Sequence, residues 1–404
     1  MRHLHFGAGN FGLGFVVPLF VKAGAKTLVV NRASPKTGGD APSMGKNELL
    51  LRDQRYFLKY LNLSISQDSP DAVEEIRFDQ FSVLDDESGY RDIIDFAIDR
   101  ELLTITTSIK SLSNAAEVIA CINEILIQRM KAKSRTFLVA MENGFSTSDL
   151  LEKLDQPVQT SRYCVAVESS VDRICANMTQ HQLHTGVAVL GVEVEKYARL
   201  VLQQSNATKD LAKFLAPLGD TLVFTDRLAA YTMAKINVLN AGHLFIASDA
   251  HFYGIDHVDF FLAEHDVTRD TPPVEARRSF ASGILHELVA GTRAAARYEY
   301  PNDIGFHELI DELTNDDAVE GIIARFSDVH DPVARVIARL KAPSTEDIET
   351  MSDFLGSFYR KVSKPVEAFV KSTGYGPPRI TLSFLRIAAL IARREYINKA
   401  KTRH

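Results

Sequence analysis

The feature that most constrains the fold is a glycine-rich turn near the amino terminus. Residues 3–6 form a short apolar run that predicts a strand, and the turn Gly7-Ala-Gly9-Asn-Phe-Gly12 leads from it into an apolar helical stretch that ends near Ala23. A GxGxxG motif alone is weak, but this order of strand, turn and helix is what a dinucleotide-binding fold requires. The turn and the helix N-terminus predict a pyrophosphate site, and a glycine turn without a ligand is the alternative. The predicted contacts are Gly7, Gly9, Asn10, Phe11 and Gly12.

The first half of the chain alternates between strand and helix patterns. Strands are predicted at 27–30, 102–107, 136–141 and 163–167, and the β-branched run 102–107 is expected to be a central parallel strand. Residues 37–50 are predicted to be a polar, flexible connection, residues 56–63 a strand, and the acidic segment 68–100 small strands and a helix. We therefore expect an α/β fold with a Rossmann-type doubly wound sheet in this half.

The second half has a different character. Beyond about residue 195, helical periodicity dominates and strand signals are few. Helices are predicted at 206–217, 226–251, 272–297, 304–312, 316–325, 330–341, 346–371 and 378–400. We expect two domains, since 404 residues exceed one ordinary core: a dinucleotide-binding domain over 1–194 and a mostly helical substrate and catalytic domain over 195–404.

The end of the second predicted strand bears on which dinucleotide binds. An NAD-specific site usually has Asp or Glu at this position, whereas this chain has Asn31-Arg32-Ala-Ser34-Pro-Lys36. Because a guanidinium pairs well with a phosphate, the residues favour NADP, bound by Asn31 and Arg32. The alternative is that Asn31 binds an unphosphorylated ribose while Arg32 and Lys36 face solvent. The ends of the later strands place Thr107, Ser108 and Asn143 where the nicotinamide could lie.

A third group of polar residues lies in the predicted helix over 226–251. Lys235, Asn240 and His243 are at relative positions 0, 5 and 8, which fall within about one helical face. An amine with a pKa lowered by burial can act as a general base, and an amide N–H can stabilise an alkoxide. The three residues therefore predict interconversion of an alcohol and a ketone, and the alternative is a buried helix with satisfied polar groups.

Composition excludes several other classes of protein. The net charge of −6 argues against a nucleic-acid binder, and no apolar run approaches the length of a membrane span. Neither a signal peptide nor a metal-binding cluster is expected, so no metal is predicted. The three cysteines have no CxxC spacing and indicate reduced thiols in a cytosolic protein. A monomer or a dimer that acts on a small molecule is expected.

Several motifs together resemble one family. The opening 4–15, the segments Met141-Glu-Asn143 and Ser170-Val-Asp-Arg-Ile174, and the signature Lys235-x4-Asn240-x2-His243 occur in the order that is typical of the long-chain polyol-specific dehydrogenases, the mannitol dehydrogenase family. Arg325-Phe326 and Asp331-x3-Arg335-x3-Arg339 resemble its helical domain. The likeness is strongest to the mannitol-1-phosphate 5-dehydrogenases of the family.

The resemblance implies a role for each matched residue. Lys235 would be the general base, Asn143 and Asn240 would form an oxyanion hole, and His243 would orient the substrate oxygen. The implied substrate contacts are Asp172, Arg325, His330, Arg335 and Arg339. Two alternatives stay open, since Asp172 and Arg173 could form a surface ion pair, and Arg335, Arg339 and Lys341 could bind a phosphate or form a solvated helix face.

The predicted function is an NAD(P)-dependent oxidoreductase, with NADP favoured over NAD. It would interconvert a sugar alcohol and its ketose by hydride transfer, with a phosphorylated pair of the mannitol 1-phosphate and fructose 6-phosphate type as the leading substrates. Reduction of free fructose or of a keto-uronate such as fructuronate by the same residues is the first alternative. A nucleotide-binding sensor without turnover is the second.

Overall fold

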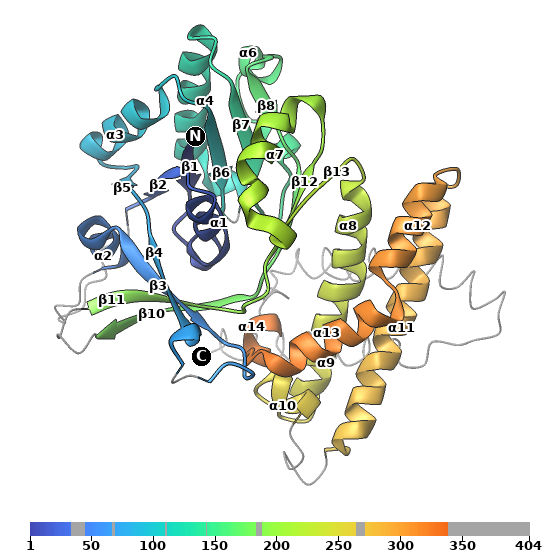
Figure 1. The fold of residues 1–404 in the computed structure, drawn as a ribbon. Coiled ribbons are helices and arrows are strands. Elements are labelled where there is room, and N and C mark those ends of the chain that lie inside the picture. Colours follow the sequence, from blue (N-terminus) through green and yellow to red (C-terminus); the bar gives the residue numbers. More distant parts are fainter. Residues whose placement is uncertain are drawn as a thin grey trace, which may run out of the picture. The chain divides into compact units, whose positions relative to one another are not determined.

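The computed structural model describes residues 1–33, 45–66, 69–109, 111–142, 144–182, 188–263 and 271–337. The chain divides into two compact units (Figure 1). The first unit comprises Met1–Leu61 and Ile65–Leu228, and the second comprises Asn62–Ser64 and the chain from Ala229 onward.

A six-stranded sheet forms the centre of the first unit. Its spatial order is β5 (Gln80–Val83), β2 (Lys26–Asn31), β1 (Arg2–Phe6), β6 (Leu103–Thr107), β7 (Thr136–Ala140) and β8 (Cys164–Ala166). Every neighbouring pair is parallel. Numbered along the chain within this sheet, the order is 3-2-1-4-5-6, which is that of a Rossmann fold. The predicted doubly wound sheet is therefore confirmed.

Helices cover both faces of this sheet (Figure 1). On one face, α3 (Glu87–Ala97) and α4 (Ala116–Lys131) pack their apolar side chains against Leu4 and Phe6 of β1. On the other face, the π-helix η1 (Gly12–Val16) and α1 (Val17–Lys22) contribute Phe15 and Phe20 to a cluster with Phe137 of β7. Buried side chains alternate between these two layers because successive strand residues point to opposite faces.

Two smaller sheets complete the first unit. One has the order β10 (Cys175–Gln182), β11 (Ala188–Val194), β3 (Arg55–Tyr60) and β4 (Val73–Arg77), and the other has the order β13 (Leu222–Thr225), β12 (Arg199–Gln203) and β9 (Ser169–Asp172). The shorter helices are α2 (Lys46–Asp53), α5 (Thr147–Leu151), α6 (Gln156–Gln159), α7 (Lys209–Leu215) and the 3₁₀ segments Pro70–Ala72, Leu112–Asn114, Asn206–Thr208 and Ala216–Thr221.

Two expectations differ from this structure. The polar connection predicted over 37–50 contains the start of α2, which buries Leu49 and Leu50 and in which Glu48 accepts a hydrogen bond from the Gly45 N–H at 2.8 Å. The domain limit predicted at residue 194 lies instead between Leu228 and Ala229. Strands β12 and β13 follow residue 194 and join β9, so the segment up to Leu228 packs with the first unit.

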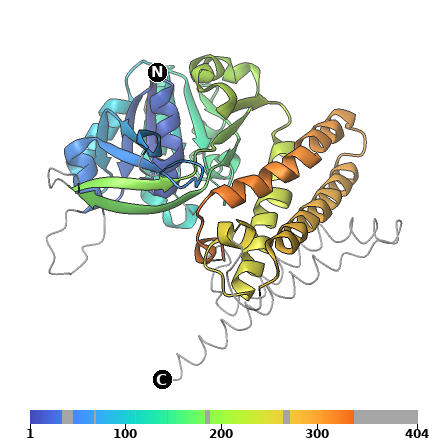
Figure 2. The ribbon, with the colours of Figure 1, turned by 60° about the horizontal axis from the view of Figure 1, so that its bottom comes forward.

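The second unit is helical (Figures 1 and 2), as predicted. Its elements are α8 (Leu228–Ala234), the π-helix η6 (Lys235–Asn240), α9 (Ala241–Phe252), α10 (Val258–Ala263), α11 (Val274–Glu299), α12 (Ile304–Leu313), α13 (Asp316–Asp328) and α14 (Val333–Ile337). Buried side chains of α9, α10, α11, α13 and α14 form one core. The helices predicted at 346–371 and 378–400 lie outside the described residues. Within the described ranges, no helix is long and apolar enough to cross a membrane.

Candidate functional site

The glycine turn follows β1, and its three glycines have different surroundings. Gly7 has a φ of +117°, and a Cβ on it would overlap the backbone of Ser108. A Cβ on Gly12 would overlap the carbonyl oxygen of Gly7 and lie 2.5 Å from His5 Nε2. A Cβ on Gly9 would meet no atom within 4 Å. The first and third glycines are therefore required by packing, while the second leaves the backbone open to a ligand.

The turn leaves two backbone donors without a partner in the described part of the chain, of which Gly9 lies at the cavity and Ala8 is buried. Among the described residues, no hydrogen bond uses the N–H groups of Ala8 or Gly9. The side chains of the next two residues have other partners: Asn10 Nδ2 donates to the Ala176 carbonyl at 2.6 Å, and the ring of Phe11 lies 5.0 Å from that of Phe15. Because free N–H groups at a helix N-terminus bind anions, the turn fits a pyrophosphate through its backbone.

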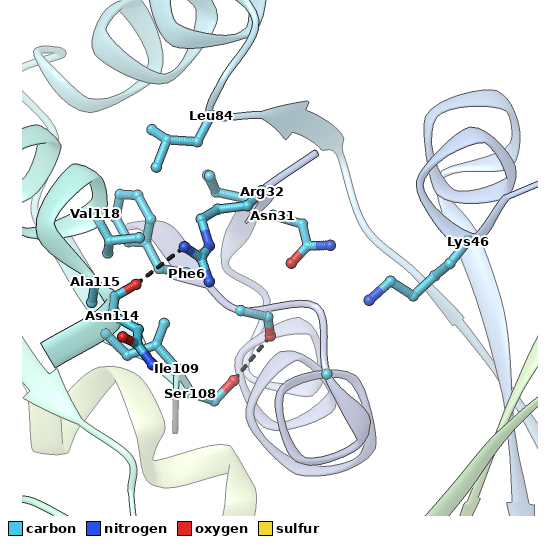
Figure 3. Close-up of a pocket in the computed structure, with 13 residues that line it drawn as sticks. Phe6, Asn31, Arg32, Lys46, Leu84, Ser108, Ile109, Asn114, Ala115 and Val118 are labelled. Carbon is cyan, nitrogen blue, oxygen red and sulfur yellow. Dashed lines mark hydrogen bonds between the residues drawn. The ribbon is translucent and has the colours of Figure 1, made fainter. Parts of the chain in front are cut away.

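A cavity of about 180 Å³ lies beside this turn (Figure 3). It is found at the carboxyl ends of β1, β2 and β6, which is where an open α/β sheet binds its ligand. Of the residues predicted to bind a cofactor, Gly7, Gly9, Asn31, Arg32 and Ser108 line this cavity. The other lining residues are Phe6, Val30, Lys46, Leu84, Ile109, Asn114, Ala115 and Val118.

The end of β2 is organised by an amide that the sequence analysis did not identify. Asn47 of α2 accepts a hydrogen bond from Asn31 Nδ2 at 2.8 Å and donates one to the Arg32 carbonyl at 2.9 Å. The Arg32 guanidinium is exposed and donates to the carbonyl of Asn114 at 3.1 Å (Figure 3). The Ala33 N–H donates to the carboxylate of Asp85, so an acidic group is close to this strand end although none follows β2 in the sequence.

Lys46 is a second residue that the sequence analysis missed. It comes from the first turn of α2, and its Nζ donates to the Ala8 carbonyl at 2.9 Å. This contact brings an ammonium group to the glycine turn and to the cavity (Figure 3). Residue 46 lies in the segment that was predicted to be a connection, so no periodic pattern indicated that it belongs to the site.

The end of β6 faces the same turn. Ser108 Oγ donates to the Gly7 carbonyl at 2.9 Å, so this hydroxyl helps to hold the turn in its conformation. Thr107 is buried, and its hydroxyl has no partner among the described residues. The Ile109 N–H donates to the carboxylate of Glu142. Asn143, predicted to be part of an oxyanion hole, lies outside the described residues.

In the second unit, Lys235 and Asn240 are the ends of the π-helix η6. In a regular α-helix, residues five apart are rotated by about 140° from one another. In a π-helix the hydrogen bond joins residues five apart, as between the Ala241 N–H and the Ile236 carbonyl, so residues five apart lie above one another. His243 follows three residues later in α9, one turn further along the same face. The π-helix therefore aligns the three predicted residues better than a regular helix would.

His243 is buried within a set of fixed side chains. Its Nε2 lies 3.2 Å from Asp331 Oδ2, and its ring stacks on Phe326 with centroids 4.2 Å apart. Arg335 Nε donates to Asp331 Oδ1 at 2.6 Å, and its NH2 group also contacts this carboxylate. Burial acts to raise the pKa of Asp331, but the hydrogen bonds from His243 and Arg335 outweigh it and hold the pKa well below its usual range. Arg335 is thus paired with a buried carboxylate.

His330 has partners of its own. Its Nδ1 lies 3.0 Å from Asp259 Oδ2, and its ring stacks on His257 with centroids 3.8 Å apart. Burial, and then the neighbouring His330, lower the pKa of His257. The buried Asp259 holds the imidazole of His330 through this contact. The sequence analysis identified neither Asp259 nor His257 as a partner of His330.

The remaining predicted substrate contacts are distributed over both units. Asp172 is the last residue of β9 in the first unit, and Arg325 lies in the last turn of α13 in the second. Arg173 donates to the carbonyls of Gly14 at 2.8 Å and Glu195 at 2.9 Å, so its guanidinium anchors backbone. Arg339 and Lys341 lie outside the described residues. No group of three potential metal ligands converges in the part of the chain that the structure describes.

Comparisons with known proteins show which family this chain resembles. Residues 1–214 match the family described as the mannitol dehydrogenase Rossmann domain. A mannitol-1-phosphate 5-dehydrogenase of Emericella nidulans is 23% identical over 258 residues, which are 63% of this chain and 59% of that protein. One of Pseudarthrobacter chlorophenolicus is 26% identical over 285 residues, which are 68% of this chain and 64% of that protein. The matches thus span less than two thirds of the length of these two relatives.

A solved structure shows the same fold. The mannitol 2-dehydrogenase of Pseudomonas fluorescens, in a ternary complex with NAD and D-mannitol, superposes with a TM-score of 0.54 at 15% identity and covers 98% of this chain and 86% of that chain. The family match extends over more than half of the chain, and the sequence motifs resemble the same family. The chain therefore belongs to the mannitol dehydrogenase family.

Proposed function

We propose that this chain is an NAD(P)-dependent oxidoreductase that interconverts a sugar alcohol, phosphorylated as in mannitol 1-phosphate, and its ketose. The observation that carries the proposal is the π-helix, which aligns an amine, an amide and an imidazole on one helical face. An irregular helix of this kind is rare and is often found at functional sites. Family membership and the names of the two relatives support polyol chemistry.

In this proposal the first unit binds the dinucleotide. The backbone of the glycine turn at Gly9 binds the pyrophosphate, and Lys46 adds a positive charge beside it. Asn31 and Arg32 bind the adenosine ribose, where the exposed guanidinium favours a 2′-phosphate and hence NADP. The carboxylate of Asp85, which lies near Ala33, would repel a 2′-phosphate. The attraction between Arg32 and that phosphate has to exceed this repulsion. When bound, the nicotinamide supplies the acceptor or donor of the hydride.

The second unit supplies the proton chemistry. Lys235 removes the hydroxyl proton of the alcohol during oxidation, and its ammonium form returns a proton to the ketone oxygen during reduction. Asn240, with Asn143, stabilises the developing alkoxide by donating N–H groups. His243 orients the same oxygen, and Asp331 restrains this imidazole through the contact to Nε2.

Further side chains bind the rest of the substrate. Asp172 and Arg325 bind hydroxyl groups, and His330, held by Asp259, binds the phosphate. Arg335 is paired with the Asp331 carboxylate, so it would attract a phosphate less strongly than an unpaired arginine. Arg339 is a further predicted cation for this group.

Initial rates of NADPH and NADH oxidation with fructose 6-phosphate, fructose and fructuronate test the proposal. Turnover is expected to be fastest with the phosphate and NADPH. Lys235→Ala should lower kcat by about 10²- to 10⁴-fold, the usual contribution of a general acid or base. Lys213→Ala, which changes an exposed lysine of α7, is the control and should leave kcat unchanged.

Each other result has a definite meaning. Faster turnover of fructose or fructuronate would assign a free polyol or a uronate as the substrate in place of the phosphorylated one, and the proposed chemistry would stay the same. Cofactor binding without turnover on any of the three ketoses would favour a nucleotide-binding sensor. Full activity of Lys235→Ala would contradict the assignment of the general acid and base.

A further inference from the structure

Two buried histidines lie on β1, directly before the glycine turn. His3 and His5 are completely buried, on the face of the strand opposite to Leu4 and Phe6. The ring of His3 stacks on Phe20 with centroids 3.8 Å apart. Buried imidazoles need hydrogen-bond partners, since an unpaired polar group in a core is costly.

Thr106 of β6 joins the two rings. Its Oγ1 lies 2.8 Å from His3 Nε2 and 2.7 Å from His5 Nδ1. His5 Nε2 lies 3.0 Å from the Gly7 carbonyl oxygen and 3.1 Å from Ser108 Oγ. The chain of contacts therefore runs from His3 through Thr106 and His5 to the glycine turn.

The Gly7 carbonyl at the end of this chain of contacts determines which nitrogen of each histidine ring carries the proton. A carbonyl oxygen only accepts, so His5 Nε2 carries the proton and donates to Gly7. Burial lowers the pKa of His5 to about 4, against the smaller raising effect of the hydrogen bond to Gly7. The ring is neutral near pH 7, and its Nδ1 accepts the hydroxyl proton of Thr106. The Thr106 oxygen is then left to accept from His3 Nε2.

The Gly7 carbonyl receives two donors, His5 Nε2 and Ser108 Oγ at 2.9 Å. Because the peptide unit is planar and trans, the N–H of Ala8 points away from the Gly7 carbonyl. Fixing this carbonyl against His5 therefore turns the Ala8 N–H away from the buried rings. Ala8 itself is completely buried, and the next residue, Gly9, lines the cavity and faces open space, so the orientation of the Gly7–Ala8 peptide sets the course of the backbone into Gly9.

We propose that His5, supported through Thr106 by His3, is a positioning residue that fixes the Gly7–Ala8 peptide and thereby sets the course of the turn past Gly9, where a dinucleotide's pyrophosphate binds. The inference rests on the proposed dinucleotide site and adds residues that touch neither the cofactor nor the substrate. It accounts for two buried polar side chains in the first strand, where apolar residues would pack at lower cost.

Binding of NADH and NADPH, followed by fluorescence titration of the full chain, tests this inference. Thr106→Val keeps the shape of the side chain and removes the hydroxyl that joins the rings. Thr104→Val is the matched control, because Thr104 is equally buried on the same strand and, within the described part of the chain, its hydroxyl bonds to Met1 Sδ alone, at 3.5 Å. Thr106→Val should weaken dinucleotide binding by about five- to tenfold, as expected for one net hydrogen bond, and Thr104→Val by less than about twofold.

A second pair of variants separates positioning from folding. His5→Leu removes the donor to Gly7, while the side-chain amide of His5→Gln keeps one. His5→Leu should raise the KM for the dinucleotide with kcat at saturating dinucleotide nearly unchanged, and His5→Gln should recover most of the affinity. A long-range ¹H–¹⁵N spectrum of the free protein should show both histidines with the proton on Nε2.

The outcomes distinguish this inference from the proposed function. If the wild type binds no dinucleotide, both fail. If the wild type binds and Thr106→Val or His5→Leu binds equally well, only the positioning role is overturned. Histidines protonated on Nδ1 would also overturn it.

Discussion

Replacing single glycines of the turn by alanine should separate cofactor binding from folding. Gly9→Ala and Gly12→Ala add the same methyl group three residues apart. At Gly9 this methyl would meet no atom within 4 Å and φ is not positive, so the fold accepts it. At Gly12 it would overlap the Gly7 carbonyl oxygen and approach His5 Nε2 to 2.5 Å. One change therefore occupies the ligand's space, and the other strains the turn itself.

The expected magnitudes differ in kind. Gly9→Ala should change the free energy of unfolding by less than about 1 kcal/mol, in the stabilising direction, because alanine restricts the unfolded chain. It should weaken dinucleotide binding by at least about tenfold, since one or more charge-assisted hydrogen bonds to the pyrophosphate are worth about 1.5–3 kcal/mol each. Gly12→Ala should lower the free energy of unfolding by about 1–3 kcal/mol, the usual cost of forcing atoms into a packed site.

Urea unfolding and NADH fluorescence titration measure the two effects on the same samples. Gly321→Ala is the control, because a Cβ at this exposed position of α13 also meets nothing within 4 Å. It should leave dinucleotide affinity unchanged. Unaltered affinity in Gly9→Ala would refute the assignment of the pyrophosphate site, and wild-type stability in Gly12→Ala would refute the packing argument.

Three further predictions concern charge and pH. The pKa of His5 is about 4 in the folded chain and near 6.5 when unfolded, so the unfolded state binds the proton first as the pH falls. His5 should therefore contribute a drop of about 3 kcal/mol in the free energy of unfolding between pH 6.5 and about 4, and the buried His3, whose pKa is also lowered by burial, should add to it. Urea midpoints across this range should fall less steeply in His5→Gln. Arg129→Met should lower the free energy of unfolding of the first unit by at least about 2 kcal/mol, measured in urea, because five hydrogen bonds of a buried guanidinium are lost. A change under about 0.5 kcal/mol, which is the scale of surface substitutions, would contradict this. Arg32→Ala should weaken NADPH binding about tenfold more than NADH binding, and equal losses would remove the argument for NADP.

The dinucleotide fold could be predicted because its constraints are local. Gly7 and Gly12 are required by a positive φ and by close packing, and such requirements are visible as a glycine pattern next to a strand. The parallel strands could be predicted from their continuous apolar runs. The limit at residue 194 was misplaced because β12 and β13 are short strands that depend on pairing with β9, which their own sequences do not reveal.

The site could be predicted only in part, for a related reason. The spacing of Lys235, Asn240 and His243 predicted a shared helical face, but it did not predict that Lys235–Asn240 form a π-helix. His3 and His5 were hidden in what was interpreted as an apolar run, although their alternation with Leu4 and Phe6 is a period-two signal. Partners that come from distant segments, such as Asp259 for His330, have no spacing by which to find them.

The central claim is that this chain transfers hydride between a nicotinamide and a sugar carbon, with Lys235 as the acid and base. The most direct measurement incubates the wild type with fructose 6-phosphate and NADPH that carries deuterium at both positions of nicotinamide C4, and examines the alcohol product by mass spectrometry. The claim predicts a single deuterium on the carbon of the new alcohol, and almost no product with Lys235→Ala. An alcohol product without deuterium, or no alcohol from any of the three ketoses, would contradict it.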